Sequence, residues 1–157
     1  MRRKDITVPV TEVTFEELSD IQRRLVALAR QATYRSYAPY SHFKVGAAIL
    51  LDNGEIVTGS NQENAAYPSG TCAERTAAYY AHSTYPDARF VTIAIAARGT
   101  DDDEVELPIS PCGACRQALI EFEPSADEPV EVILSGARRI FILPSLRSLL
   151  PLAFTEF

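Results

Sequence analysis

The chain has 157 residues, is 46% hydrophobic and 23% charged, and carries a formal net charge of -6 at pH 7. These values suit one globular domain spanning residues 1–157 and lie far from those of disordered and membrane proteins. No apolar run approaches the roughly 18 residues that span a bilayer, and the acidic balance argues against a polynucleotide partner, because phosphate binding needs a basic face.

The N-terminal segment and the cysteine count both bear on the compartment. A basic start leads into Ile6-Thr7-Val8-Pro9-Val10, which is too short and too polar for a signal-peptide core. The chain has three cysteines, an odd number that fits a metal site in a reducing compartment better than a disulfide framework. We therefore expect a cytoplasmic protein. The pair Arg138-Arg139 is interpreted as solvated surface charge.

An amphipathic helix is predicted from Thr14 to about Ala32. Thr14 and Glu17 have the spacing of a capping box at its start. Apolar residues at steps of three and four form the face that should pack on the core: Leu18, Ile21, Leu25, Leu28 and Ala32. The other face is polar and basic, which puts this helix on the outside of the domain.

An aromatic loop follows at residues 34–43, where Pro39 disfavours a helix. Its three tyrosines are interpreted mainly as packing residues with satisfied hydroxyls, although such a loop can also form the wall of a site. His42 has no second histidine at ligand spacing, and His82 stands alone late in a predicted helix. Neither histidine is predicted to bind a metal ion.

A hairpin is predicted next, with strands at 44–51 and 55–60 on either side of Asp52-Asn53-Gly54. Its second strand runs into the polar run Asn61-Gln62-Glu63-Asn64. Such a run is common in surface loops, and it is also where a scaffold can present hydrogen-bonding groups to a small polar ligand. The residues alone leave both interpretations open.

Two further helices are predicted at the cysteine segments. One should run from Thr71 to about His82, with Glu74 at capping-box spacing from Thr71. The other should begin with Ser110 as its N-cap, before a proline at the first helical position, and end at about Phe122.

The remaining segments complete an alternating pattern. They are predicted as a central strand at 90–97, a solvated acidic loop at 101–106, short strands at 130–134 and 139–143, and a short helix at 144–150. Alternating helices and strands indicate an α/β fold with one central sheet. The tail from Leu149 to Phe154 is unusually apolar for a terminus, so we expect it to be buried, for example against a neighbouring subunit.

The three cysteines lie in a C-x-E segment and a P-C-x-x-C segment about forty positions apart. Cys72, Cys112 and Cys115 can supply three thiolates to one zinc ion, and helix N-termini favour the ionised form of a thiol. Three protein ligands leave one tetrahedral position open, which is typical of a catalytic site. A redox pair or an incomplete zinc knuckle is the alternative for Cys112 and Cys115, and the third cysteine argues against both.

Glu74 and two arginines are the candidate partners of this metal. By spacing alone, Glu74 is as compatible with capping Thr71 as with catalysis. Beside an open zinc position, a carboxylate is well suited to general acid and base chemistry. Zinc with three thiolates carries a net negative charge, so we expect a cation close by, either Arg75 or Arg116.

With these residues placed, the chain resembles the small zinc-dependent cytidine deaminases of the homotetrameric type. The resemblance extends from the tyrosine-rich loop to the C-terminal Leu-Leu-Pro segment. The matching blocks are Ala38-Pro39-Tyr40-Ser41-His42-Phe43, Val45-Gly46-Ala47-Ala48, 59–68, Cys72-Ala73-Glu74-Arg75 and 110–117. The resemblance implies a three-layer α/β/α sandwich with a mixed five-stranded sheet, and a homotetramer with pockets at its subunit interfaces.

The resemblance also implies the reaction. It is hydrolytic deamination of cytidine and deoxycytidine to uridine and deoxyuridine plus ammonia, with one zinc ion per subunit held by Cys72, Cys112 and Cys115. Hydroxide on the zinc attacks C4, and Glu74 carries protons to N3 and to the leaving amine, the scheme shared by zinc nucleobase deaminases in general.

Substrate contacts follow from the same resemblance. Phe43 lies against the pyrimidine, while Asn61 and Glu63 hold the ribose hydroxyls. The backbone N–H of Ala73 binds the base carbonyl at a helix N-terminus. Phe154 enters the pocket of a neighbouring subunit.

Two departures and two alternatives accompany this interpretation. Gln62 stands where the family has an aliphatic residue, and the acidic segment 101–106 lengthens a loop, so both bear on which cytosine nucleoside is preferred. The first alternative is a deaminase of another aminopyrimidine or aminopurine, including a cytosine-bearing antibiotic or a base in a polynucleotide. Phe43 with the Asn61 and Glu63 pair argues against the antibiotic. A catalytically inactive zinc-binding assembly protein is disfavoured by retention of the cysteines and Glu74. Polynucleotide editing would need a strand channel for which little chain remains.

Overall fold

A mixed six-stranded sheet forms the centre of the fold in the computed structural model, which describes residues 1–126 and 128–155. The strand order is β1-β6-β5-β4-β2-β3. The strands are β1 (Thr11–Val13), β2 (Lys44–Leu51), β3 (Ile56–Ser60), β4 (Phe90–Arg98), β5 (Glu131–Ser135) and β6 (Ile140–Leu143). β4 and β5 are parallel, and every other neighbouring pair is antiparallel.

The prediction of five strands is wrong because of β1. This strand has only three residues, is largely exposed and lies at the edge of the sheet against β6. It therefore has neither the length nor the apolar alternation by which strands are predicted. The predicted hairpin of β2 and β3 and the central strand β4 are confirmed.

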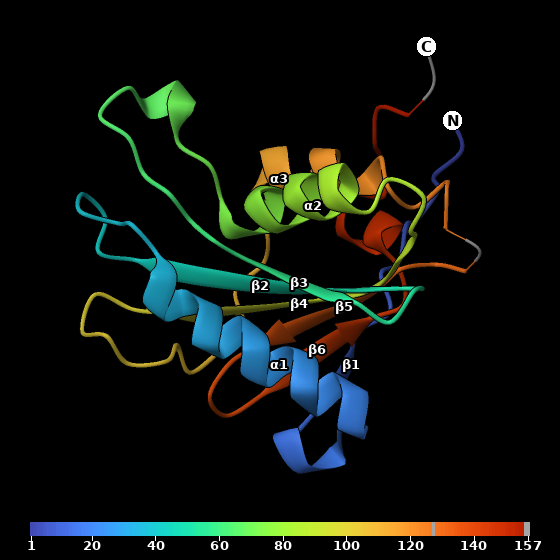
Figure 1. Ribbon diagram of the computed structural model, residues 1–157. Helices are drawn as coiled ribbons and strands as arrows, with labels where there is room; N and C mark the ends of the chain where they lie inside the picture. The colour runs from blue at the N-terminus through green and yellow to red at the C-terminus, as the bar shows by residue number, and fades with distance from the viewer. Residues whose placement is uncertain (127, 156–157) are drawn as a thin grey trace.

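Helices cover both faces of this sheet (Figure 1). The α-helices of the described residues are α1 (Asp20–Ala32), α2 (Ala73–Thr84) and α3 (Gly113–Ile120). Short 3-10 turns lie at Phe15–Glu17, Thr33–Arg35, Tyr67–Ser69 and Leu146–Leu149. α1 packs on one face, whereas α2 and α3 lie side by side on the opposite face (Figure 1). No helix of the described residues is long and apolar enough to cross a membrane.

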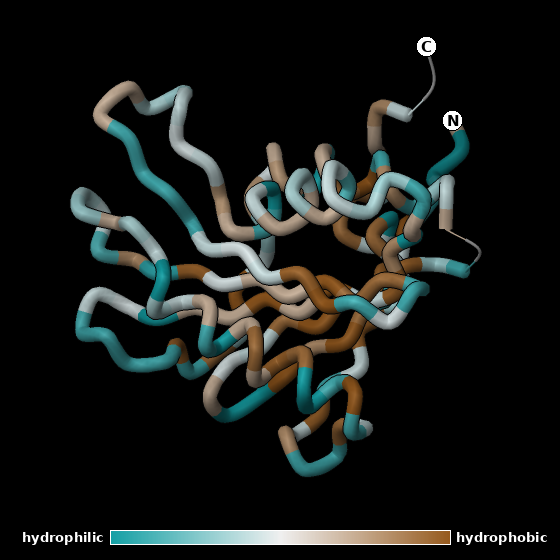
Figure 2. Tube along the Cα trace, in the orientation of Figure 1, coloured by the Kyte–Doolittle hydropathy of each residue, from teal (hydrophilic) through white to brown (hydrophobic). Residues whose placement is uncertain are grey.

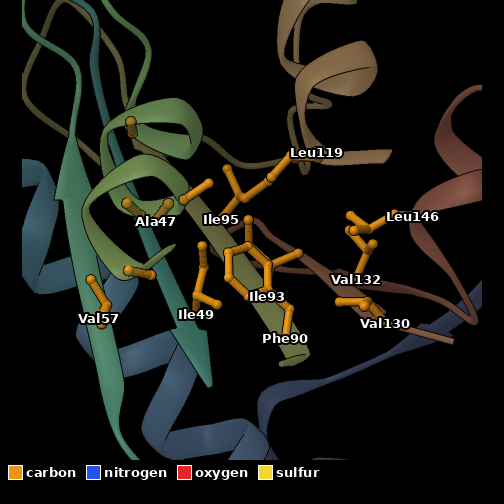
Figure 3. Close-up of a cluster of buried hydrophobic side chains, with 14 of the residues drawn as sticks. Ala47, Ile49, Val57, Phe90, Ile93, Ile95, Leu119, Val130, Val132 and Leu146 are labelled. Carbon is orange, nitrogen blue, oxygen red and sulfur yellow. The ribbon is translucent and has the colours of Figure 1, made fainter. Parts of the chain in front are cut away.

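The core consists of two apolar clusters, one on each face of the sheet. On the side of α2 and α3, Ile93 and Ile95 of β4 pack with residues of β2, β5 and α3 (Figure 3). On the side of α1, Ala94 and Ala96 of the same strand pack with α1. This alternation explains why β4 is apolar almost throughout. Figure 2 shows that the strands of the sheet are largely hydrophobic, whereas many of the loops around them are hydrophilic.

The first helix begins later than predicted. Its N-cap is Ser19, which forms a capping box with Gln22. Thr14 and Glu17 form their capping box around a separate 3-10 turn, and Leu18 has an extended conformation that ends this turn. The two N-caps, Thr14 and Ser19, are thus five residues apart. Leu18 lies between them, ends the first turn and is buried.

The buried face of α1 is also rotated from the predicted stripe. Ile21 is 41% exposed, whereas Val26 and Ala29 are fully buried. A Cβ atom on Gly46 of β2 would lie only 2.1 Å from the Ala29 carbonyl oxygen. The glycine therefore lets α1 approach β2 closely, and this contact selects the face that is buried.

The N-caps predicted for the other two helices are wrong. Cys72 and Cys112 are the N-caps of α2 and α3, not Thr71 and Ser110. Thr71 instead exchanges two backbone hydrogen bonds with Gln62, each 2.9 Å long. This bridge keeps Thr71 extended, so the helix begins after Cys72.

Two carboxylates of the acidic segment 101–106 form ion pairs with other parts of the chain. Glu104 forms an ion pair with Nε of Arg30 at 2.6 Å, and both side chains are mostly covered. Asp102 binds Nζ of Lys44 at 2.7 Å. The solvated interpretation is therefore wrong for Glu104, whereas Asp102 forms its ion pair at the exposed surface.

Candidate functional site

Three cysteine side chains from the N-termini of α2 and α3 converge on one point. Sγ of Cys72 and Sγ of Cys112 are 3.8 Å apart, and all three sulfurs, including that of Cys115, lie within 4.8 Å of one another. Zinc bound to thiolates at about 2.3 Å in tetrahedral geometry holds its sulfurs about 3.8 Å apart. The donor set therefore fits one zinc ion.

The helix starts direct these thiols toward one another. Cys72 and Cys112 occupy N-cap positions, where serine, threonine, aspartate and asparagine usually accept a bond from the helix backbone. Neither cysteine side chain makes such a bond. Cys115 lies three residues after Cys112, so both face the same side of the first turn of α3.

The thiols already differ in their affinity for protons. A hydrogen bond from the Cys115 thiol, together with one from Arg75, lowers the pKa of Cys72 to about 5 despite its burial. The pKa of Cys115 is raised, because its thiol donates to Cys72 and because it is buried. The contacts of Cys72 therefore favour its thiolate, the form that zinc requires.

Arg75 is the cation next to this thiolate. Its Nη2 lies 3.9 Å from Sγ of Cys72, and this contact is the main cause that raises the pKa of Arg75. Nε of Arg75 is buried without a hydrogen-bond partner in the described part of the chain. Of the two arginines considered from the sequence, Arg75 is therefore the one that contacts a thiolate.

Arg116 has a different set of partners. It donates to the Pro111 carbonyl at 2.8 Å and to the Ser110 hydroxyl at 2.8 Å. It also donates to the Leu149 carbonyl at 3.1 Å. These bonds tie the segment before α3 to the C-terminal turn, so Arg116 supports the cysteine motif through backbone contacts.

Glu74 is a buried carboxyl beside the thiols. It is the second residue of α2 and is only 3% exposed. Burial raises the pKa of Glu74, and the negative charge of Cys72 raises it further. Because the N-cap is Cys72, the capping box with Thr71 is not formed, and the capping interpretation is wrong.

A cavity of about 390 Å³ adjoins the cysteine cluster. Its lining residues are Tyr40, Asn61, Gln62, Glu63, Asn64, Tyr67, Gly70, Thr71, Cys72 and Arg75. Among the residues predicted from the sequence, it brings Asn61 and Glu63 together with Cys72 and Arg75. Phe43, Ala73 and Glu74 are not on its wall, nor are the two cysteines of α3.

Asn61 holds the start of β2. Its Oδ1 accepts a hydrogen bond from the Val45 N–H at 2.8 Å, and its Nδ2 donates to the Phe43 carbonyl at 2.9 Å. A carboxamide has two N–H groups and two lone pairs on its oxygen. One donor and one acceptor of Asn61 therefore remain for a ligand.

Glu63 holds the aromatic loop. Its Oε2 accepts from the Tyr40 N–H at 2.9 Å and from the Ser41 N–H at 3.2 Å, and its Oε1 accepts from the Ser41 hydroxyl. The Ser41 hydroxyl, followed by the Tyr40 N–H, lowers the pKa of Glu63 below its ordinary value. The carboxylate is thus ionised at neutral pH and keeps an acceptor position on Oε1.

The remaining predicted residues lie around this core. Phe43 is half-buried and follows His42, which has a left-handed φ of 55°. Ala73 opens α2, where backbone N–H groups have no acceptor within the helix. Phe154 is 69% exposed, and the Gln117 side chain binds both its carbonyl oxygen at 2.8 Å and its N–H at 3.4 Å.

The structure adds Tyr67 and the hydrogen bonds of Ser41 to this region, and the sequence assigns a role to neither of them. The tyrosines of the aromatic loop were predicted mainly to pack inside, but Tyr34, Tyr37 and Tyr40 are all exposed. The ring of Tyr40 meets that of Tyr67 edge to face at 6.4 Å. The presence of Phe43 in the same loop is the signal in the sequence for this location, and it does not indicate the hydrogen-bond partner of Ser41.

Comparisons with known proteins agree with this geometry. Residues 19–127 match the family described as the cytidine and deoxycytidylate deaminase zinc-binding region. A cytidine deaminase from Halalkalibacterium halodurans is 38% identical over 134 residues, which is 85% of this chain and 94% of that protein. A probable cytidine deaminase from Dictyostelium discoideum is 35% identical over 85% of this chain and 83% of its own length.

A solved structure is similar as well. The crystal structure of cytidine deaminase from Burkholderia pseudomallei has a TM-score of 0.72 and is 37% identical. The similarity covers 87% of this chain and 100% of that one.

Proposed function

The chain belongs to the zinc-dependent cytidine deaminases, and we propose that it hydrolyses cytidine and deoxycytidine to uridine and deoxyuridine with release of ammonia. The observation that carries this proposal is the position of Glu74. A buried carboxyl whose pKa is raised lies beside three converging thiols, next to a cavity that Asn61 and Glu63 help to line. This arrangement suits proton transfer at an activated water molecule.

The residues divide the reaction between them. Cys72, Cys112 and Cys115 would hold the zinc ion, which when bound acts as a Lewis acid and lowers the pKa of a water molecule to near 7. Glu74 would accept one proton of the attacking water at its carboxylate and donate it to N3 of the ring, while the water oxygen bonds to C4. It would then carry the second proton of the water to the 4-amino group, so that ammonia leaves as the C4–N bond breaks and the C4–O bond remains.

The sugar is bound by the hydrogen-bonding groups of Asn61 and Glu63 that other residues of the chain leave unused. Asn61 has one N–H to donate, and Glu63 has one acceptor position on Oε1. A single hydroxyl can satisfy both, since it donates one hydrogen bond and accepts another. The 3′-hydroxyl is common to ribose and deoxyribose, which supports acceptance of both nucleosides.

The base is held by backbone and aromatic groups. The N–H of Ala73 at the start of α2 is suited to the base carbonyl, because helix N-termini attract acceptors. Phe43 is proposed to lie against the pyrimidine ring. The hydrogen bond between Asn61 and the Phe43 carbonyl supports this role, because it connects the sugar and base ends of the site.

The assembly is proposed to be a homotetramer of single-domain subunits, each a three-layer α/β/α sandwich. The exposed ring of Phe154, with its backbone anchored by Gln117, supports insertion into the pocket of a neighbouring subunit. A site with three thiolates also fits the reducing conditions of the cytoplasm.

Ammonia release tests the function. Purified protein is incubated with cytidine, deoxycytidine, cytosine and adenosine, and ammonia is measured. Only the two cytosine nucleosides should react. Glu74→Ala should lose about 10²- to 10⁴-fold in kcat while it retains zinc, whereas Glu55→Ala, which changes an exposed carboxylate, should behave as wild type. Absence of turnover with both nucleosides would overturn the proposal.

A further inference from the structure

Ser41 connects two residues of the proposed substrate site. Its hydroxyl donates to Oε1 of Glu63 and accepts from the N–H of Phe43 at 3.1 Å. Its own N–H donates to Oε2 of the same carboxylate at 3.2 Å. The residue thus connects the carboxylate proposed to bind the sugar with the backbone of Phe43, whose ring is proposed to lie against the base.

The contact with Phe43 fixes the direction of the hydroxyl. A serine hydroxyl has a single O–H donor and rotates freely unless its acceptor side is engaged. Here the N–H of Phe43 occupies that side, which leaves the O–H directed at Glu63. The donor is therefore oriented before any ligand arrives.

The position of Oε1 of Glu63 depends on the Ser41 hydroxyl more than on the backbone N–H groups. Both backbone N–H groups, from Tyr40 and Ser41, bind Oε2, whereas Oε1 is bound by the Ser41 hydroxyl. The terminal torsion of a glutamate is broad, so a carboxylate held at one oxygen can turn. Removing the hydroxyl would release Oε1, the oxygen whose remaining lone pair is available to the substrate.

We propose that Ser41 is a positioning residue that directs the free lone pair of Glu63 Oε1 at one hydroxyl of the substrate sugar. The inference rests on the proposed deamination of cytosine nucleosides. It gives Ser41, which does not itself line the cavity, a role in selecting substrates that carry this sugar hydroxyl.

The electrostatic surroundings agree with a charge-assisted hydrogen bond. The Ser41 hydroxyl is the largest cause of the lowered pKa of Glu63. The other ionisable groups near this carboxylate are His42, which lowers the same pKa weakly, and the cavity residues Tyr40, Tyr67, Cys72 and Arg75. None of these groups replaces the hydroxyl at Oε1.

A comparison of two substrates distinguishes a positioning role of Ser41 from a general effect of Ser41 on protein stability. Cytidine and 2′,3′-dideoxycytidine differ only in the sugar hydroxyls, so kcat/KM for each is measured with wild type, Ser41→Ala and Ser41→Thr. Ser41→Ala should lose about fivefold to tenfold in kcat/KM for cytidine, mainly through KM. It should leave kcat/KM for dideoxycytidine unchanged. Ser41→Thr, which keeps the hydroxyl, should show the wild-type ratio of kcat/KM between cytidine and dideoxycytidine.

Ser36→Ala is the matched control. Its hydroxyl donates to the Val45 carbonyl at 3.1 Å and does not contact Glu63, so its removal should change both substrates equally or not at all. Equal losses of Ser41→Ala on both substrates, or no loss on either, would overturn the positioning role while leaving deamination intact. Absence of turnover by wild type would instead overturn the proposed function.

Discussion

Gly59 determines how closely α2 approaches the sheet. A Cβ atom at this position would lie 2.4 Å from the Ala77 nitrogen, 2.6 Å from the Ala73 carbonyl oxygen and 2.9 Å from the Ala77 Cα. All three are backbone atoms of α2, so no side-chain rotation can relieve the overlap. Ordinary contacts lie at about 3.5 Å, so Gly59→Ala must displace the start of α2 by roughly 1 Å.

The expected cost follows from overpacking, which destabilises a core by about 1–3 kcal/mol. For a chain of this size that lowers Tm by several degrees. Because the displaced turn contains Cys72 and Glu74, we also expect weaker zinc retention against a chelator. Thermal unfolding and the zinc content after dialysis measure the two effects.

Gly113→Ala is the control, since nothing lies within 4 Å of the added methyl although the residue is adjacent to Cys112. It should unfold at the wild-type temperature and keep its zinc. A Gly59→Ala protein with wild-type Tm and zinc content would refute the argument that backbone contact at this glycine sets the position of α2.

Three further predictions concern the site. Arg75→Gln should move the acidic limb of the pH–rate profile up by about one unit or loosen zinc, because a cation beside the thiolates favours ionisation of the bound water; an unchanged profile and zinc content would contradict this. Because the pKa of Glu63 is lowered, its charge is lost only as pH falls below the ordinary carboxylate range. KM for cytidine should therefore stay constant from pH 7 to 5 in steady-state assays. A rise of KM within that range would contradict binding of the sugar by an ionised Glu63. Gln117→Ala and Phe154→Ala should both raise KM for cytidine, and size-exclusion chromatography tests whether the proposed tetramer forms; wild-type KM in both variants would exclude a role of the tail in a neighbouring subunit's pocket.

The sequence predicts those parts of the fold that local pattern determines. The apolar run of β4 indicates a strand covered on both faces, and the turn before Glu55 indicates a hairpin; both are confirmed. The spacing of Cys112 and Cys115 likewise brings their sulfurs together, because residues three apart share one face of a helical turn.

Helix starts are harder to predict, because several adjacent residues can serve as caps. Thr71 is a good N-cap by type, but its bridge to Gln62 keeps it in an extended conformation. That bridge joins residues nine positions apart and leaves no local signature. Tertiary contact thus overrides capping preference.

The partners of Glu63 show the same limit at the site. Ser41 lies 22 residues before Glu63, and the pattern around either residue does not indicate their hydrogen bond. The sequence singled out Glu63 through a polar run and a resemblance. Only the fold brings the aromatic loop onto its carboxylate.

The most direct test of the account uses isotopically labelled water. Cytidine is incubated with the purified protein in H₂¹⁸O, and the nucleoside product is analysed by mass spectrometry alongside ammonia. We predict uridine with one ¹⁸O atom in the base and one ammonia per uridine, both abolished in Glu74→Ala. Unlabelled uridine, or no uridine at all, would contradict hydrolytic deamination at this site.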